Sequence, residues 1–77
     1  MTKQQKITVG VSRRNLILRL ERSLAKDGRE LRIHRNGTRT VYLVVETAKN
    51  EIAETTDDIE ALAHQIGALQ PYEVLAD

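Results

Sequence analysis

The sequence predicts a small α+β domain in which two helices cover one face of a three-stranded antiparallel sheet. Two segments, residues 13–26 and 58–66, carry apolar residues at helical spacing. Between them, an Asn36-Gly37 turn separates two β-rich runs, and a third run covers residues 52–55. The predicted order is therefore α-β-β-β-α, with a possible extra strand at the N-terminus.

The N-terminal residues 1–5 are expected to form a disordered tail ahead of a single domain over residues 6–77, because 77 residues make one domain. In residues 6–11 every second residue is apolar, which indicates a short strand. A chain of this length buries only about 60% of the surface that its unfolded form exposes, so its stability is expected to be marginal. With no Cys and two His, self-association is the remaining route to extra stability.

The first helix is predicted to run from Arg13 to about Lys26. Ser12 is a favourable N-cap, and Gly28 is the residue type that best tolerates the left-handed conformation after a helix end. At 100° per residue, one face of this helix gathers the side chains expected in the core: Leu16, Ile17, Leu20 and Leu24.

A β-hairpin is predicted for residues 31–45, and two registers are open. A two-residue Asn36-Gly37 turn puts the apolar residues of the first strand, Leu31 and Ile33, on the face that carries Thr40, Tyr42 and Val44. A three-residue loop over residues 35–37 groups them instead with Val41, Leu43 and Val45. We favour the three-residue loop because it concentrates branched residues on one buried face, and a slip of one residue reverses every side chain. The outer face then carries Arg32, His34, Thr40 and Tyr42.

After a second turn around Lys49-Asn50 and the third strand, a second helix is predicted to end at Gly67. Asp57 is the expected N-cap, and Glu60 is expected to reach back to it from the third helical position. The apolar residues at helical spacing are Ile59, Leu62, Ala63 and Ile66. Pro71 then lies either in a turn or at the first position of a short helical segment that carries Val74 and Leu75.

Charge divides sharply between the two halves of the chain, although the net charge is only +1. Residues 1–39 hold eleven Lys and Arg against three carboxylates, which gives +8. Residues 40–77 hold one Lys against eight carboxylates, which gives −7. Such an asymmetry predicts a partner that recognises one sign of charge.

Catalysis is not expected, because the chain has no Cys nucleophile, no Gly-rich phosphate loop and no His beside a Ser and a carboxylate at a suggestive spacing. His34 and His64 are expected to face solvent, and Asp57 with Asp58 to stabilise the positive end of a helix. No catalytic residue, cofactor, metal or small-molecule substrate is predicted. The longest apolar run, residues 41–45, is far short of the roughly 20 that span a bilayer, so no membrane partner is expected. The absence of Cys makes the cytoplasm the default location.

The basic residues allow a functional interpretation and a structural one. Arg19, Arg22 and Lys26 fall with Asn15 on one side of the first helix, where like charges repel and no acid lies on the same stripe. The structural interpretation is a solvated face whose late cations complement the helix dipole. The functional interpretation is a surface that binds nucleic acid, with phosphate contacts that weaken as salt rises. The candidate site residues are Arg19, Arg22, Lys26, Arg29, Arg32, Arg35 and Arg39.

Two known nucleic-acid-binding architectures agree with only part of this sequence. Double-stranded RNA-binding domains share the helix, three strands and helix, but here the start of the second helix carries Asp57, Asp58 and Glu60 instead of basic residues. Binding of single strands on a sheet needs stacking aromatics, and Tyr42 is the only aromatic residue in the predicted sheet. The alternative function is a protein-interaction module, a homodimer or an inhibitor of a host protein, that uses the acidic C-terminal half.

Four stretches carry a resemblance to a known group: 12–17, 24–28, 58–63 and 67–73. Together they resemble small uncharacterised proteins carried on mobile elements of proteobacteria, over residues 12–76. The resemblance implies a bacterial accessory protein borne by such an element, and it implies no activity or functional residue. With the charge pattern, it leads us to expect a non-enzymatic accessory or regulatory protein that binds nucleic acid.

Overall fold

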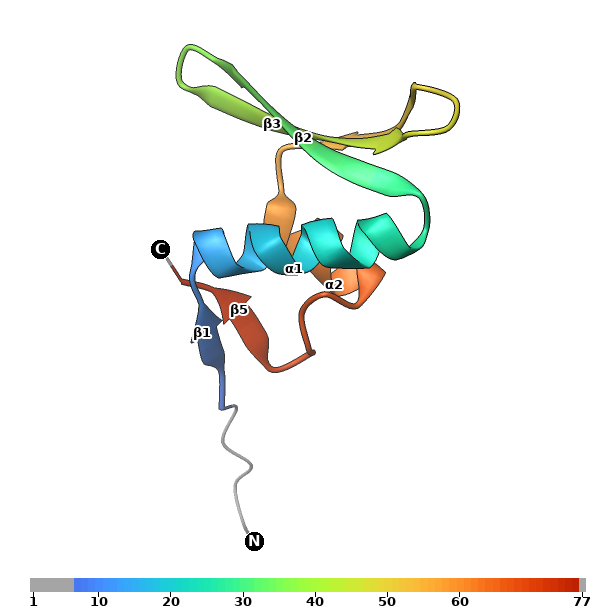
Figure 1. Cartoon of the computed structure of the whole chain (residues 1–77). Helices are drawn as coiled ribbons and strands as arrows, with labels where there is room; N and C mark the ends of the chain where they lie inside the picture. The colour runs from blue at the N-terminus through green and yellow to red at the C-terminus, as the bar shows by residue number, and fades with distance from the viewer. Residues whose placement is uncertain (1–6, 77) are drawn as a thin grey trace, which may run out of the picture.

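Residues 7–76 fold into two helices, a three-stranded antiparallel sheet and a separate parallel pair of strands (Figure 1), which confirms the predicted α+β class. The structure is a computed structural model that describes residues 7–76, so the predicted tail at residues 1–5 lies outside the described residues. The elements are, in chain order, β1 (Val9–Val11), α1 (Arg13–Lys26), β2 (Arg29–Asn36), β3 (Arg39–Glu46), β4 (Glu51–Thr56), α2 (Ile59–Ile66) and β5 (Glu73–Leu75).

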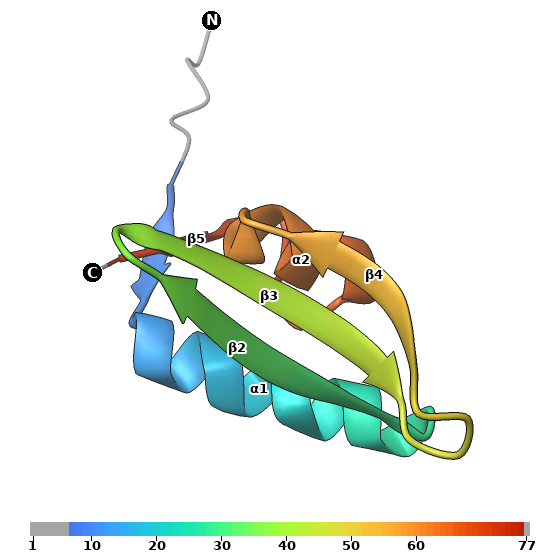
Figure 2. The same cartoon turned by 90° about the horizontal axis from the view of Figure 1, so that it is seen from above.

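Both helices lie on one face of the sheet, whose strand order is β2-β3-β4, and no helix of the described residues covers the opposite face (Figure 1). Seen from above, α1 runs along the β2 side of the sheet and α2 lies on the β4 side (Figure 2). The core fills the space between the helices and the sheet. This is the layer arrangement that the order of elements predicts.

The boundaries of α1 agree with the sequence. The Ser12 hydroxyl accepts a hydrogen bond from the backbone N–H of Asn15 at 3.2 Å, as an N-cap does. Gly28 has a positive φ of 71° directly after the helix, a conformation that favours glycine. Of the four predicted core residues, Leu16, Leu20 and Leu24 are buried and form one stripe along the helix, and Ile17 is half-buried.

The favoured hairpin register is wrong. Leu31 pairs with Val44, and Ile33 with Tyr42, so the even-numbered residues of β3 share the helix-facing side with the apolar residues of β2. The two-residue turn is Gly37-Thr38, flanked by the pair Asn36 and Arg39. Gly37 has a φ of 64°, and a positive φ at the first loop residue is what a type II′ hairpin turn requires.

Tyr42 therefore lies in the core and not on the outer face. Its hydroxyl accepts a hydrogen bond from Nη1 of Arg13 at 2.7 Å, which satisfies the polar end of a buried ring. Counting branched residues misled the prediction because β3 is apolar on both faces: Val41 and Leu43 lie half-buried on the outer face. Turn chemistry, with glycine at the first loop position, determines the register.

The predicted N-terminal strand exists as β1, but it does not extend the three-stranded sheet. It pairs in parallel with β5, in a register that places Val9 beside Glu73 and Val11 beside Leu75. Pro71 lies in a turn, as one of the two alternatives had it, and the segment after it is a strand and not a helix. Glycine is required at position 10, where β1 passes close to the residue after β5, because a Cβ there would lie 2.7 Å from the Cβ of Ala76.

The second helix begins one residue later than predicted. Asp58, and not Asp57, is the N-cap, and its Oδ1 accepts a hydrogen bond from the backbone N–H of Ala61 at 3.0 Å. Glu60 does not reach back to the cap, because its Oε2 accepts the backbone N–H of Leu75 in β5. The predicted core residues Ile59, Leu62 and Ala63 are buried, Ile66 is half-buried, and Gly67 ends the helix with a φ of 89°.

Candidate nucleic-acid interface

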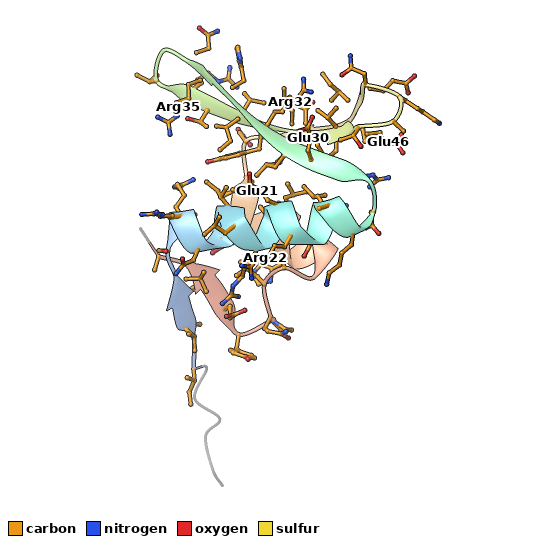
Figure 3. All side chains as sticks on the ribbon, viewed as in Figure 1. Glu21, Arg22, Glu30, Arg32, Arg35 and Glu46 are labelled. Atoms are coloured by element: carbon orange, nitrogen blue, oxygen red, sulfur yellow. The ribbon has the colours of Figure 1, made fainter. Side chains whose placement is uncertain are left out.

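The seven predicted cations do not form one continuous surface. Arg19, Arg22 and Lys26 belong to α1, whereas the other four belong to β2 and β3. Arg22 points away from the sheet on the far side of α1, and Arg32 and Arg35 lie on the hairpin on the other side of the helix (Figure 3). The hairpin cations are Arg29, Arg32, Arg35 and Arg39.

Arg19 is held by a carboxylate that sequence analysis did not assign to the site. Its Nη1 donates to both carboxylate oxygens of Glu73, at 2.8 and 2.9 Å. The Glu73 side chain is 10% exposed, while that of Arg19 is 43% exposed. The pair joins the middle of α1 to β5. The further contact to the Ala68 carbonyl at 3.5 Å also comes from Nη1, so Nη1 makes all the hydrogen bonds of this guanidinium to residues 7–76.

Glu73 is stabilised as a carboxylate. The backbone N–H of Gln70 donates to its Oε1 at 2.9 Å, and this bond, followed by the bond from Arg19, holds the pKa of Glu73 below its ordinary value. An ionised Glu73 fixes one edge of the Arg19 guanidinium. The Nε and Nη2 groups of Arg19 donate to none of residues 7–76.

A shallow hollow on the outer side of α1 collects the side chains of the predicted stripe. It has a volume of about 230 Å³ and is lined by Asn15, Leu18, Arg19 and Arg22. Arg22 makes no hydrogen bond or ion pair to another described residue, and Lys26 follows one turn later with none either. We name this surface the α1 basic face: Asn15, Arg19, Arg22 and Lys26.

The hairpin cations differ in how far they are neutralised. Arg32 donates from Nε and Nη2 to Oε1 of Glu30, at 3.1 and 2.7 Å, so its charge is partly compensated. Arg29, Arg35 and Arg39 are exposed and have no ion pair within residues 7–76. Arg35 and Arg39 lie beside the turn at the far end of the hairpin, on opposite faces of it by strand alternation, and we name this region the hairpin end.

The division of charge along the chain becomes a division in space. Residues 13–36, which form α1 and β2, hold eight cations and three carboxylates, for a net charge of +5. Residues 51–66, which form β4 and α2, hold five carboxylates and no Lys or Arg, for a net charge of −5. These two halves lie on opposite sides of the sheet's long axis (Figure 2), so the acids do not surround the α1 basic face.

The mode of binding used by double-stranded RNA-binding domains does not transfer to this chain. The order of helix, three strands and helix is present, but Asp57 is exposed at the start of α2 and the Asp58 carboxylate caps it. Phosphate docking at that helix end is opposed by these charges. With Tyr42 buried, the outer face of the sheet offers no aromatic ring for base stacking within the described residues.

Other site types are not seen among residues 7–76. No group of three or more His, Asp or Glu side chains there could hold a metal ion, and no helix there is long and apolar enough to cross a membrane. His34 and His64 are exposed, as predicted. No family model, no curated protein and no solved structure matches the chain.

Proposed function

We propose that this chain is a non-enzymatic, cytoplasmic accessory protein that binds nucleic acid through the α1 basic face. The observation that carries the proposal is the arrangement of Arg19 beside Arg22, with Arg19 held at one nitrogen by Glu73 and Arg22 without an ion pair to any described carboxylate. A guanidinium oriented by a buried carboxylate loses little conformational freedom when it meets a phosphate. Arg22 and Lys26 add two exposed cations to the same surface.

The position of the acidic residues supports binding of a polyanion on the α1 side of the domain. A polyanion that approaches α1 meets the side of the domain with net charge +5, while the side with net charge −5 faces away. Coulombic steering of this kind raises the association rate and falls with ionic strength. A second contact is expected at the hairpin end, where Arg35 and Arg39 make no ion pair with another described residue.

Phosphate contacts of this number give modest affinity with a measurable salt dependence. Three contacts from α1 predict a slope of about −2.7 in log K against log salt, which is a loss of about 40-fold between about 50 and 200 mM salt. Two more contacts from the hairpin end steepen the slope to about −4.5. Base-specific recognition is not part of the proposal, because phosphate contacts carry no sequence information.

The test is retention of a short fluorescent DNA duplex, an RNA duplex and a single strand by the purified protein across a salt series. Arg22→Ala with Lys26→Ala is expected to reduce the size of the slope by about 1.8, since two phosphate contacts are lost. Lys49→Ala is the matched control for Lys26→Ala, because Lys49 is an exposed cation on the turn between β3 and β4. Equal effects of the two lysine variants contradict the assignment to α1.

A second candidate function is a protein interaction through the acidic side. It is favoured by Glu51, Glu54 and Asp57, which make no ion pair with any other described residue and follow one another along the β4 edge and the turn after it. This candidate predicts no salt-sensitive retention of nucleic acid by the wild-type protein. The same salt series therefore separates the two functions.

A further inference from the structure

Three strand edges are open in the described part of the chain. The β2-β3-β4 sheet leaves β2 and β4 without an outer neighbour, and the small parallel sheet leaves β1 without one (Figure 1). The outer edge of β5 is closed, because the N–H of Glu73 donates to the Gln70 carbonyl and that of Leu75 to Oε2 of Glu60. An open edge is a row of backbone donors and acceptors that another strand can use.

The backbone of β1 presents such groups to the outside. The N–H of Val9 donates to the Tyr72 carbonyl at 2.9 Å, and the carbonyl of Val11 accepts the N–H of Ala76 at 2.8 Å. The backbone polar groups of Val9 and Val11 therefore point toward β5. Successive peptide groups alternate between the two edges of a strand. The peptide groups of Thr8 and Gly10 therefore point away from β5 and have no strand partner among residues 7–76.

Charge protects the other two open edges against pairing with themselves. Three arginines lie along β2, and Glu51 and Glu54 lie along β4. Pairing β2 with β2 or β4 with β4 of a second copy brings like charges together, which is how natural sheets avoid edge-to-edge association. Residues 7–11 contain no charged residue, so β1 lacks this protection.

The surroundings of β1 are apolar and exposed. Ile7 is 74% exposed, Val9 45% and Tyr72 54%, so three of the six exposed large apolar side chains among residues 7–76 lie at this small sheet. Ile7 and Tyr72 line, with Thr8, Pro71 and Val74, a hollow of about 380 Å³. A pair of three-residue strands needs covering elements or further strands to be stable, and here one side of the pair packs on the core through Val11 and Leu75.

We propose that two copies of this chain associate through their β1 strands, which pair antiparallel about a twofold axis to form a continuous β5-β1-β1-β5 sheet. The partner is a second copy because the same uncharged edge occurs in both chains, and a twofold pairing of identical edges is self-complementary. The pairing uses up the open edge of each β1, so association stops at two. It also covers Ile7 and Val9 of both copies, and it leaves the α1 basic face uninvolved.

Sedimentation equilibrium at about 100 µM protein tests the proposal, since dimerisation depends on concentration. The wild type is expected to have the mass of two chains. Val9→Lys is expected to be monomeric, because it puts like charges on the shared edge. Leu18→Lys, which also introduces Lys at a similarly exposed apolar residue but on α1, is expected to stay dimeric. A mixture of Val9→Lys with Val9→Glu is expected to regain the dimer mass, which a mere folding defect does not explain. A monomeric wild type, or a dimeric Val9→Lys variant, overturns the proposal.

Amide hydrogen exchange on the unmodified protein gives a second readout that needs no variant. The outward N–H groups of Thr8 and Gly10 are expected to gain protection as protein concentration rises through the dimerisation range. The amide of Arg32, in the edge strand β2, serves as the internal control and is expected to be independent of concentration. Exchange of the β1 amides that stays fast at every concentration contradicts the strand pairing.

Discussion

Two valines on β3 allow the hairpin register to be tested by one chemical change made on opposite faces of the sheet. Val44 is 1% exposed and faces the helices, whereas Val41 is half-buried on the outer face. Replacing Val44 by Ala removes two methyl groups, worth about 1.6 kcal/mol in transfer from water. The cavity of about 40 Å³ that remains adds about 1 kcal/mol. The expected loss in the free energy of unfolding is therefore about 2.5 kcal/mol.

Because Val41 is only half-buried, Val41→Ala loses about half of the transfer free energy and leaves no closed cavity. We therefore expect its free energy of unfolding to fall by about 0.8 kcal/mol. Urea unfolding followed by circular dichroism measures both values, provided that the slope of the free energy of unfolding against urea concentration is the same in each variant. In a domain of this size the difference amounts to a shift of roughly 10 °C in Tm. If Val41→Ala destabilises the protein as much as Val44→Ala or more, the odd-numbered residues of β3 face the core and the register described above is refuted.

Three further changes test local features of the fold and site. Asp58→Ala is expected to cost about 1 kcal/mol because it removes the N-cap of α2, while Asp57→Ala should stay within about 0.5 kcal/mol in the same urea experiment. Gly10→Ala is expected to destabilise the protein by about 1–3 kcal/mol through its clash with Ala76, and Ala76→Gly should restore most of that loss in a double-mutant cycle. Glu73→Gln should weaken the dependence of the free energy of unfolding on pH in the acid range. The folded protein holds the pKa of Glu73 below its ordinary value of 4.5, so the ionised carboxylate stabilises the fold above that pH. This stabilisation is lost as pH falls through the lowered pKa. Stability measured against pH for the wild type and Glu73→Gln should therefore converge at low pH.

Elements with local signals could be predicted from the sequence. For α1, Ser12 and Gly28 mark the ends and the leucine stripe marks the buried face, and all of these signals lie within the helix or next to it. The class of the fold follows in the same way from the order of its segments. The parallel pairing of β1 with β5 could not be predicted, because it joins residues separated by more than sixty positions and neither strand alone carries a pairing signal.

The hairpin and the site depended on contacts that sequence patterns do not show. Val41 and Leu43 alternate with Tyr42 and Val44 in a strand that is apolar throughout, so periodicity does not distinguish its two faces. The stripe of cations on α1 was identified correctly as a single side of the helix. Its carboxylate partner, Glu73, lies 54 residues from Arg19 in the sequence. Nothing in the sequence distinguishes Glu73 from the other carboxylates among the eight in residues 40–77.

Backbone amide chemical shifts, recorded while a short DNA duplex is added to isotope-labelled protein, test most directly whether nucleic acid binds at the α1 basic face. The largest changes are expected in residues 15–26, with smaller ones around Arg35 and Arg39, and both sets should fade as salt is added. Changes centred on β4 and α2, or no changes at low salt, would contradict nucleic-acid binding through the α1 basic face.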